Sequence, residues 1–342
     1  MIIQKRRDMV LNNQNKTKDI KLLREEIKAI EQCWGKLDKS SYNCFKFYKK
    51  MGVFNPEMVP NSIYAQAERI LNPFRYSLFL QHKCCLKFLL EDKYRPKTII
   101  QNIDNHYIDK DDNIITKKKA IELVKCHSQC VIKIAAGSGG GRGVIKIKNT
   151  DDISSIFSLY NKDFICQEIL KEHPTLSQFN PKCINTIRVL SLNINDNCTI
   201  LSSFVRMGGL GSFVDNLHST EGNGALVGLK PDGSLHSFGI DKNYRVVSKS
   251  PMGNSFEGVR IEHYDKVVDF VKQIHSQRFP FANLIGWDII IDENESPIAI
   301  EINLDSADIA AHQIFNGPIF GNRREEVMEY IKKNPQKLLL RL

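Results

Sequence analysis

The segment 285–303 constrains the fold most, because two apolar runs there flank a short acidic stretch. This pattern is typical of two strands joined by a tight turn. A turn centred between residues 294 and 295 pairs Asp288 with Glu301. Side chains alternate between the two faces of a strand, so Glu301 and Asn303 face the same side as Asp288. The sequence therefore predicts two carboxylates and an amide oxygen on one face of a β-hairpin.

This set of oxygen atoms predicts a metal site. Two carboxylates directly opposite each other destabilise a sheet unless a cation lies between them. Oxygen ligands favour one or two Mg²⁺ ions, with Mn²⁺ as a substitute, and phosphates typically complete the coordination of such an ion. Asp288, Glu301 and Asn303 are the predicted ligands. The alternative, which this segment leaves open, is an ordinary hairpin with a solvated acidic face.

Composition predicts a folded protein with a basic N-terminal region. The 342 residues are 42% hydrophobic and 25% charged, which suits two or three subdomains and excludes a disordered chain. Residues 1–50 contain 13 lysines and arginines against 6 acidic residues, while the whole chain carries a net charge of +9. This region could contact anionic lipid, a polyanionic glycan or nucleic acid. A solvated, lysine-rich helix face is the simpler interpretation.

The cysteines and the N-terminus favour a cytoplasmic protein. Nine cysteines, an odd number, show no spacing typical of a disulfide framework. Cys126, His127 and Cys130 could bind a soft metal, but they lack a fourth ligand, so buried thiols are the preferred interpretation. Neither an apolar segment after Lys5–Arg7 nor an apolar run of about 20 residues is present. We expect no signal peptide and no membrane-spanning helix, although the basic region could lie at the inner membrane face.

Hydrophobic spacing predicts an N-terminal helical domain, residues 1–95, that packs on the following chain or recruits a partner. Its expected helices are Asp19–Trp34, Ser41–Met51 and residues 62–90. The remainder is expected to form strands and helices in the order 98–103, 112–115, helix 117–125, 144–147, helix 152–159, a strand ending at 167–170, two antiparallel strands carrying Arg188 and Arg206, a glycine-rich segment 208–228, helix 262–278, the hairpin, and helix 323–342.

A glycine-rich loop is the second candidate site. A strand carrying Lys133 leads into Gly137–Gly143, and the chain then returns directly into a strand. A Walker A loop or a Rossmann loop would open a helix, so both interpretations fail. Glycines allow backbone N–H groups to approach phosphate oxygens, and Lys133 adds a positive charge. The loop therefore predicts a phosphate-binding hairpin, with a plain hairpin loop as the alternative.

The chain resembles the ATP-grasp superfamily in the order of its motifs. These are Lys133, the glycine loop, the sequences QEIL and NTIR, Arg206, and the sequences VDN, GWD and EIN. The chain looks most like the sugar-transfer-associated ATP-grasp group, which is tied to cell-surface polysaccharide biosynthesis, and is also similar to glutamate-adding and glutathione-synthetase-like ligases. The resemblance covers about residues 96–330. The sequence departs from the family pattern at Gly286, where some of these ligases have an arginine, and in the residues after Asn303. The identity of the acceptor substrate therefore stays open.

The resemblance implies an α+β ATP-grasp fold, with two α+β lobes sandwiching ATP: residues 96–170 with the glycine flap and 171–342 with the metal site. It also implies roles for individual residues. Lys133 would contact phosphates beneath a flap that contains Gly137, Ser138, Gly139, Gly140 and Gly141. Gln167, Glu168, Ile169 and Leu170 would hold adenine, and Glu172 or His173 would reach the ribose. Arg188 and Arg206 would bind the reacting phosphate, and Asp215 and Asn216 would lie near the nucleotide and the acceptor. Asp288, Glu301 and Asn303 would bind the Mg²⁺ ions.

The implied reaction is an ATP- and Mg²⁺-dependent carboxylate–amine ligation through an acyl-phosphate. Its partners would be a small-molecule or sugar-linked carboxylate, an amine acceptor and, as a further candidate, a glycosyltransferase. A phosphotransferase acting on a sugar or small-molecule hydroxyl would need a similar ATP site and is the main alternative. Two others are a non-catalytic nucleotide-binding partner of a glycosyltransferase complex and nucleic-acid binding through residues 1–50.

Overall fold

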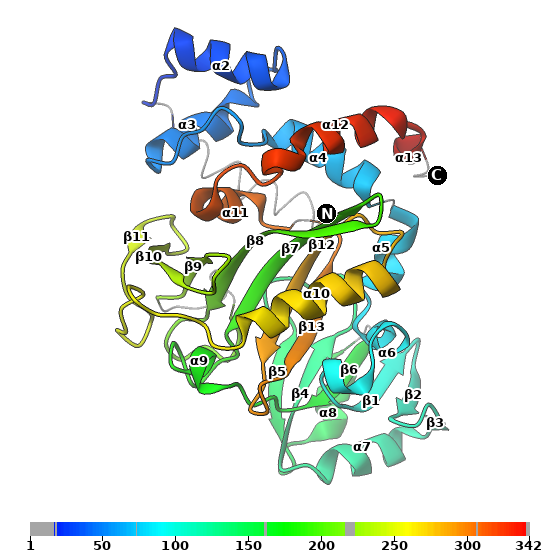
Figure 1. Ribbon diagram of the computed structural model, residues 1–342. Helices are drawn as coiled ribbons and strands as arrows, with labels where there is room; N and C mark the ends of the chain where they lie inside the picture. The colour runs from blue at the N-terminus through cyan, green and yellow to red at the C-terminus, as the bar shows by residue number, and fades with distance from the viewer. Residues whose placement is uncertain are drawn as a thin grey trace.

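Two antiparallel β-sheets form the centre of the molecule (Figure 1). The computed structural model describes residues 17, 19–72, 74–160, 163–215, 223–305 and 307–339. One sheet has six strands in the order β3-β2-β1-β6-β4-β5, and the other has seven in the order β11-β10-β9-β8-β7-β12-β13. The predicted α+β class is therefore confirmed.

The six-stranded sheet carries the glycine loop between β4 and β5. The helices α7 (Lys117–Lys125) and α8 (Ile153–Leu159) pack against it around a core that includes Ile100, Ile132 and Phe164. Both helices have a side-chain N-cap, because Thr116 accepts from the backbone of Lys119 and Asp152 from that of Ser155. The strands are β1 (Thr98–Ile103), β2 (His106–Asp109), β3 (Ile114–Ile115), β4 (Gln129–Ile134), β5 (Val144–Lys148) and β6 (Phe164–Glu168).

The seven-stranded sheet contains the predicted hairpin. Its inner strands β7 and β12 are buried along their whole length, and the helices α10 (Tyr264–Arg278) and α11 (Ile309–Asn316) both pack on the sheet. Trp287 lies in the core between β12 and α10, against the ring of Phe270. The strands are β7 (Thr186–Ile194), β8 (Asn197–Met207), β9 (Ala225–Leu229), β10 (Leu235–Ile240), β11 (Val246–Val247), β12 (Leu284–Ile291) and β13 (Pro297–Asn303).

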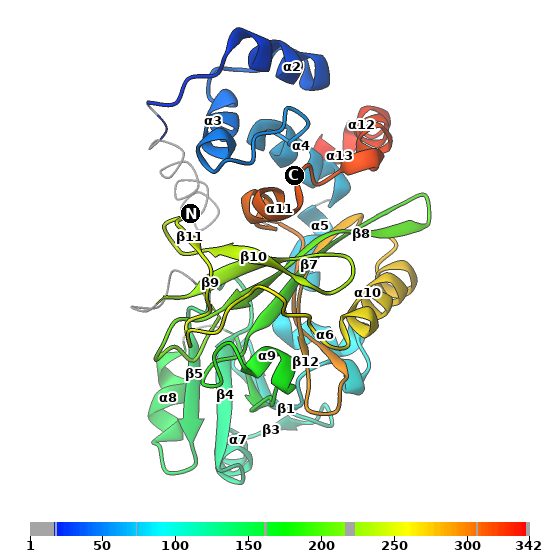
Figure 2. The same ribbon diagram turned by 60° about the vertical axis from the view of Figure 1, so that its left-hand side comes forward.

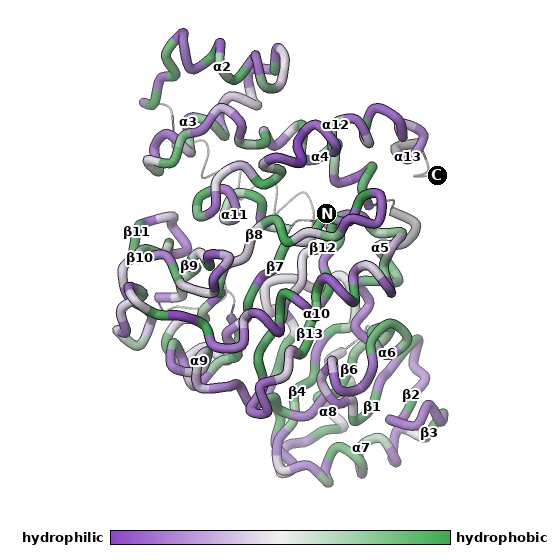
Figure 3. Tube along the Cα trace, in the orientation of Figure 1, coloured by the Kyte–Doolittle hydropathy of each residue, from purple (hydrophilic) through white to green (hydrophobic). Residues whose placement is uncertain are grey.

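The short helices before β1 are α2 (Arg24–Trp34), α3 (Tyr42–Lys50), α4 (Asn61–Leu71), α5 (Phe74–Leu80) and α6 (Leu86–Leu89), with 3₁₀ turns at Lys83–Cys85 and Asp92–Tyr94. Of these, α4 packs against the C-terminal helices (Figure 2). The C-terminal helices are α12 (Arg324–Lys333) and α13 (Gln336–Leu339), and α12 is largely hydrophilic in Figure 3. None of the helices in the described ranges has the length and apolar composition of a membrane-spanning helix.

Several secondary-structure predictions differ from the structure. The helix expected over 62–90 is divided into α4, α5, a 3₁₀ turn and α6. Asn72, directly after α4, donates its side-chain amide to the carbonyls of Leu284 and Leu304, so tertiary contacts end this helix. The helix expected over 19–34 begins at Arg24, and the helix expected over 323–342 is divided between α12 and α13. The strands β2, β9, β10 and β11 and the helix α11 were not predicted. The sequences of β2, β9 and β10 contain few of the β-branched residues that favour a strand assignment.

The N-terminal helices share a hydrophobic core with the seven-stranded sheet. Phe45 and Tyr48 of α3 belong to the same cluster as Phe204 of β8 and Phe315 of α11. Gln313 of α11 lies fully buried within this interface. Its Oε1 accepts from the Val59 backbone N–H at 2.6 Å, and its Nε2 donates to the Tyr48 hydroxyl at 2.8 Å and to the Val59 carbonyl at 3.2 Å. One amide therefore satisfies three buried polar groups of the N-terminal region.

We predict that Gln313→Leu destabilises the protein by about 2 to 4 kcal/mol, because it leaves these buried groups unsatisfied. Urea unfolding measures the change, with Gln273→Leu on the exposed face of α10 as the matched control. The control should remain within about 0.5 kcal/mol of the wild type. Equal stability of the two variants would contradict the assigned role of Gln313.

Candidate functional site

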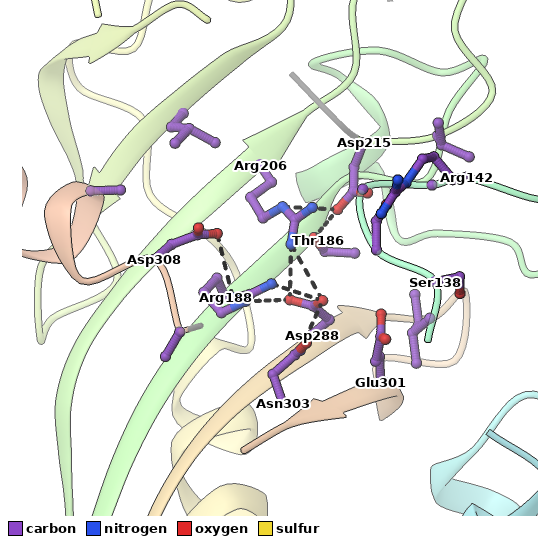
Figure 4. Close-up of a pocket in the computed structure, with 18 of the residues that line it drawn as sticks. Ser138, Arg142, Thr186, Arg188, Arg206, Asp215, Asp288, Glu301, Asn303 and Asp308 are labelled. Atoms are coloured by element: carbon purple, nitrogen blue, oxygen red, sulfur yellow. Dashed lines mark hydrogen bonds and ion pairs between the residues drawn. The ribbon is translucent and has the colours of Figure 1, made fainter. Parts of the chain in front are cut away.

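A cavity of about 1440 Å³ opens between the two sheets and extends to the N-terminal helices. Its walls include Lys133 on β4, the loop residues Ser138, Gly139, Gly140, Gly141 and Arg142, and the end of β6 with Glu168, Ile169 and Leu170. From the seven-stranded sheet come Thr186, Arg188, Arg206, Asp288, Glu301 and Asn303. Figure 4 shows that the acidic and basic side chains of this group converge.

The predicted hairpin brings the three metal-ligand candidates together. In β12 and β13, Asp288 pairs with Glu301 and Gly286 pairs with Asn303. The Asn303 Nδ2 lies 3.4 Å from Asp288 Oδ2. The turn, however, lies half a residue earlier than predicted, since Ile291 pairs with Pro297, and a β-bulge beside Asp288 restores the register. The extra residue is Ile300 of β13, which also lines the cavity.

Two arginines hold the Asp288 carboxylate. Arg188 lies directly opposite Asp288 on β7, with its Nε 2.5 Å from Oδ1 and its Nη2 3.0 Å from Oδ2. Arg206 on β8 places Nη1 3.3 Å from both oxygens, and its Nε lies 3.3 Å from Asp215. The Thr186 hydroxyl donates to Asp215. The arginines predicted from the sequence therefore form one network with the metal-ligand candidate (Figure 4).

This network fixes the charge of Asp288. Burial by itself raises the pKa of this carboxyl group, but the charges of Arg188 and Arg206 outweigh burial, and the pKa is lowered. Burial likewise lowers the pKa of Arg206, and the charges of Asp215 and Asp288 more than compensate. The carboxylate and both guanidinium groups therefore remain charged across the physiological pH range, so the site presents fixed charges to a ligand.

Lys83 completes the site and was not predicted. This buried side chain comes from the 3₁₀ turn after α5, and its Nζ lies 3.1 Å from Glu301 Oε1 and 3.4 Å from Ser138 Oγ. It therefore bridges the loop after β4 and the metal-ligand hairpin. A single lysine between short helices carries no motif, so only the tertiary structure could identify it.

Lys133 provides a second cation in the same part of the cavity. Burial, and then the positive charge of Lys83, lower the pKa of Lys133 to about 8. The two ammonium groups repel each other, and a polyanion between them would relieve the repulsion. The pair is thus suited to phosphate oxygens.

The glycine loop packs closely against the site. A Cβ on Gly141 would lie 2.7 Å from the Val214 side chain, and one on Gly143 would lie 2.4 Å from Ile134 Cδ1. Both glycines have a positive φ, 68° and 69°. The loop therefore requires glycine for its backbone conformation and for its approach to the residue beside Asp215.

Some of the predicted site residues lie outside the cavity lining. Gly137 is absent from it, and Gln167 is buried in β6 with its Nε2 3.5 Å from the Pro96 carbonyl. Glu172 accepts hydrogen bonds from the backbone and the side chain of Asn185, so its carboxylate binds the chain just before β7. His173 caps the short helix α9 (Pro174–Ser177) and packs against His263. Asn216 lies outside the described residues.

The donor set fits a hard divalent cation. Asp288, Glu301 and Asn303 offer two carboxylates and an amide oxygen on one face of the hairpin, and Lys83 and Lys133 lie on the same side as Glu301. Oxygen ligands of this kind suit Mg²⁺ and leave coordination positions for phosphate. In this structure, the lysine ammonium of Lys83 pairs with the carboxylate of Glu301.

A comparison with protein-family models identifies the group that the sequence resembles. A family model described as sugar-transfer associated ATP-grasp matches residues 150–329, which contain the arginines and the three metal-ligand candidates, whereas Lys133 and the glycine loop precede the match. A search of curated proteins found no significant match.

Similar solved structures include the ATP-grasp ligase PsnB with a minimal precursor (TM-score 0.44, 14% identity, 76% of this chain and 64% of that chain). Another is D-alanyl-alanine synthetase A from Vibrio cholerae (TM-score 0.43, 12% identity, 75% of this chain and 64% of that chain). A third is VanG D-Ala:D-Ser ligase from Enterococcus faecalis (TM-score 0.46, 10% identity, 74% of this chain and 62% of that chain). This chain thus spans less than two thirds of the length of each of these proteins.

We predict that ATP binding takes up about half a proton at pH 8, because Lys133 is half protonated at its pKa of about 8 and phosphate raises that pKa. Uptake should decline toward pH 6.5, where Lys133 is already charged. Calorimetry in buffers of different ionisation enthalpy measures it. Lys133→Met should abolish the uptake, whereas Lys148→Met at an exposed position should retain it. A pH-independent proton balance in the wild type would refute the assignment.

We also predict that nucleotide protects the loop 137–143 from hydrogen exchange. Glycines contribute no side chains of their own to packing, so a phosphate ligand would add to the loop's order. With a non-hydrolysable ATP analogue and Mg²⁺, these amides should exchange more slowly, while the exposed turn 110–113 at β2 and β3 serves as an unaffected control. Nucleotide binding without protection of residues 137–143 would exclude the loop as a phosphate site.

Proposed function

The chain belongs to the sugar-transfer-associated ATP-grasp family, and from this we propose that it is an ATP- and Mg²⁺-dependent carboxylate–amine ligase. It would activate a carboxylate as an acyl-phosphate and transfer the acyl group to an amine, releasing ADP and phosphate. We further propose that the product belongs to cell-surface polysaccharide biosynthesis. The observation that carries the proposal is the buried network of Arg188, Arg206 and Asp288 beside Glu301 and two lysines.

The lysines and the loop support ATP binding. Lys83 and Lys133 provide positive charge for the phosphates, and Glu168 to Leu170 line the wall beyond them. Asp288, Glu301 and Asn303 would hold Mg²⁺, which when bound neutralises phosphate charge. The glycine loop, packed on Val214, would exclude water from the reacting groups.

The arginine pair supports chemistry on a carboxylate. Arg188 and Arg206 both line the cavity, and a guanidinium group binds carboxylate and phosphate oxygens through parallel N–H donors. They would orient the carboxylate substrate and stabilise the negative charge that develops as the phosphoryl group is transferred. Asp288 and Asp215 fix both guanidinium groups in place before any ligand binds.

The cysteines of the cavity support a reaction without an enzyme-bound covalent intermediate. Cys44 and Cys183 line it, and burial raises the pKa of each to about 12. Both thiols therefore remain protonated near neutral pH and are poor nucleophiles. Direct attack of the substrate carboxylate on the γ-phosphate requires neither of them.

A hydroxylamine assay tests the ligase function. Acyl-phosphates react with hydroxylamine, whereas a phosphate ester of a hydroxyl group does not. A panel of amino acids and uronic acids, with ATP, Mg²⁺ and hydroxylamine, should yield ADP, phosphate and a hydroxamate for the correct acid. Arg206→Ala should lower the rate about 10²- to 10³-fold, because a charge-stabilising donor is lost.

Two variants control this experiment. Arg206→Lys retains the charge beside Asp288 and should fold normally while losing part of the rate, and Arg245→Ala at an exposed position should retain full activity. Melting temperatures identify any variant that fails to fold. A stable phosphorylated product, without free phosphate or hydroxamate across the panel, would favour the phosphotransferase instead.

A further inference from the structure

Two histidines and a glutamate come together outside the cavity described above. His173 directly precedes α9, and Glu262 and His263 lie at the start of α10, beside α9 (Figure 1). One ring nitrogen of each histidine and one carboxylate oxygen of Glu262 all lie within 4.8 Å of one another. Both histidines are half-buried and Glu262 is exposed, so an ion from solvent can reach the group.

The two imidazole rings have the spacing of rings that share one metal ion. Their centroids lie 5.1 Å apart, and their planes meet at 88°. Two imidazoles on one tetrahedral ion, each with a metal–nitrogen bond of about 2.0 to 2.1 Å, have centroids about 5 Å apart. An ordinary edge-to-face contact has a similar spacing. The carboxylate of Glu262 beside both rings is what distinguishes a metal site from such a contact.

Backbone hydrogen bonds fix both halves of this group. The His173 N–H donates to the carbonyl of Ile291, the last residue of β12, at 2.9 Å. The Glu262 N–H donates to the Thr175 hydroxyl at 2.9 Å, which ties the start of α10 to α9. The backbone therefore brings the three side chains together before any ion binds, and this lowers the entropic cost of binding.

His263 has a conformation that the helix alone does not explain. It is the N-cap of α10, with a left-handed backbone (φ 62°), and within the described residues its side chain makes no capping hydrogen bond. N-caps favour Ser, Thr, Asp and Asn, whose oxygens accept from the first backbone N–H groups of a helix. Strained backbone conformations cost about 1 to 3 kcal/mol and cluster at ligand sites. An imidazole that binds an ion accounts for a histidine at this position.

The donor types select the ion. Imidazole nitrogens together with a carboxylate suit Zn²⁺, whereas Mg²⁺ takes oxygen ligands. The His173 Nδ1 accepts from the Thr175 backbone N–H at 3.3 Å, and coordination of this ring gives up that long hydrogen bond. Glu295 adds negative charge, because its Oε2 lies 3.6 Å from His263 Nε2. The Lys266 ammonium pairs with the same oxygen at 2.9 Å, so Glu295 is not counted among the ligands.

We propose that His173, Glu262 and His263 form a binding site for Zn²⁺, with water in the remaining coordination position. His173 follows the last strand of the six-stranded sheet, and α10 packs on the seven-stranded sheet. The bound ion would therefore fasten the segment that connects the two sheets to the second of them. This inference depends neither on the proposed ligase function nor on the Mg²⁺ ligands of the hairpin.

Zinc binding to the full chain tests the proposal. After treatment with EDTA and removal of the chelator, calorimetry with ZnCl₂ in excess MgCl₂ should show a site with a Kd of about 1 μM or tighter. His173→Ala and His263→Ala should each weaken binding about tenfold or more, because the loss of a residue that merely orients a metal ligand already costs about 10- to 100-fold. Glu262→Gln should weaken it severalfold. The ring-proton NMR signals of both histidines should shift when zinc is added.

Two variants serve as controls. His106→Ala, at an exposed position of β2, and Cys126→Ser, which removes an exposed thiol, should both retain the wild-type affinity. Melting temperatures in EDTA verify that each variant folds, and zinc should raise the melting temperature of the wild type but not that of His263→Ala. Absence of the zinc site in the wild type would overturn the inference. Binding that persists in both histidine variants, or that is lost in Cys126→Ser, would overturn it as well.

Discussion

The buried ion pair between Asp288 and Arg188 is the interaction on which the site depends. The two residues face each other across β12 and β7, so the sheet register itself sets their contact. Both are about 95% buried, and removing one partner of such a pair leaves an uncompensated charge that costs about 3 to 5 kcal/mol. Arg206 shares the carboxylate from β8 and links it to Asp215. Three adjacent strands thereby hold a preformed set of charges at the centre of the cavity.

The sequence predicted the parts of this site that depend on local periodicity. Alternation along two apolar runs sufficed to pair Asp288 with Glu301, and the same reasoning placed Arg188 and Arg206 on neighbouring strands. The bulge at Ile300 was not predicted, because one extra residue in a strand leaves the apolar pattern almost unchanged. The pairing was nevertheless correct, since the shifted turn and the bulge compensate each other.

Long-range contacts could not be predicted in this way. Lys83 reaches Glu301 across 218 positions of sequence, and Gln313 reaches Val59 across 254. Neither residue belongs to a periodic pattern or a motif, and only the fold brings these pairs together. The division of the 62–90 segment has the same origin, because Asn72 binds the backbone of residues that lie more than 200 positions later. Local propensity has no access to such partners.

The shared core of α3, α11 and β8 has a consequence for how this protein can diversify. Domains that join through a small polar interface can be exchanged as modules by recombination. Here Phe45 and Tyr48 are completed by Phe204 and Phe315, so a foreign N-terminal region would have to reproduce the same apolar surface. New selectivity is therefore more accessible by single substitutions on the cavity face of α4, which leave the buried face of that helix, including Ala67 and Leu71, intact.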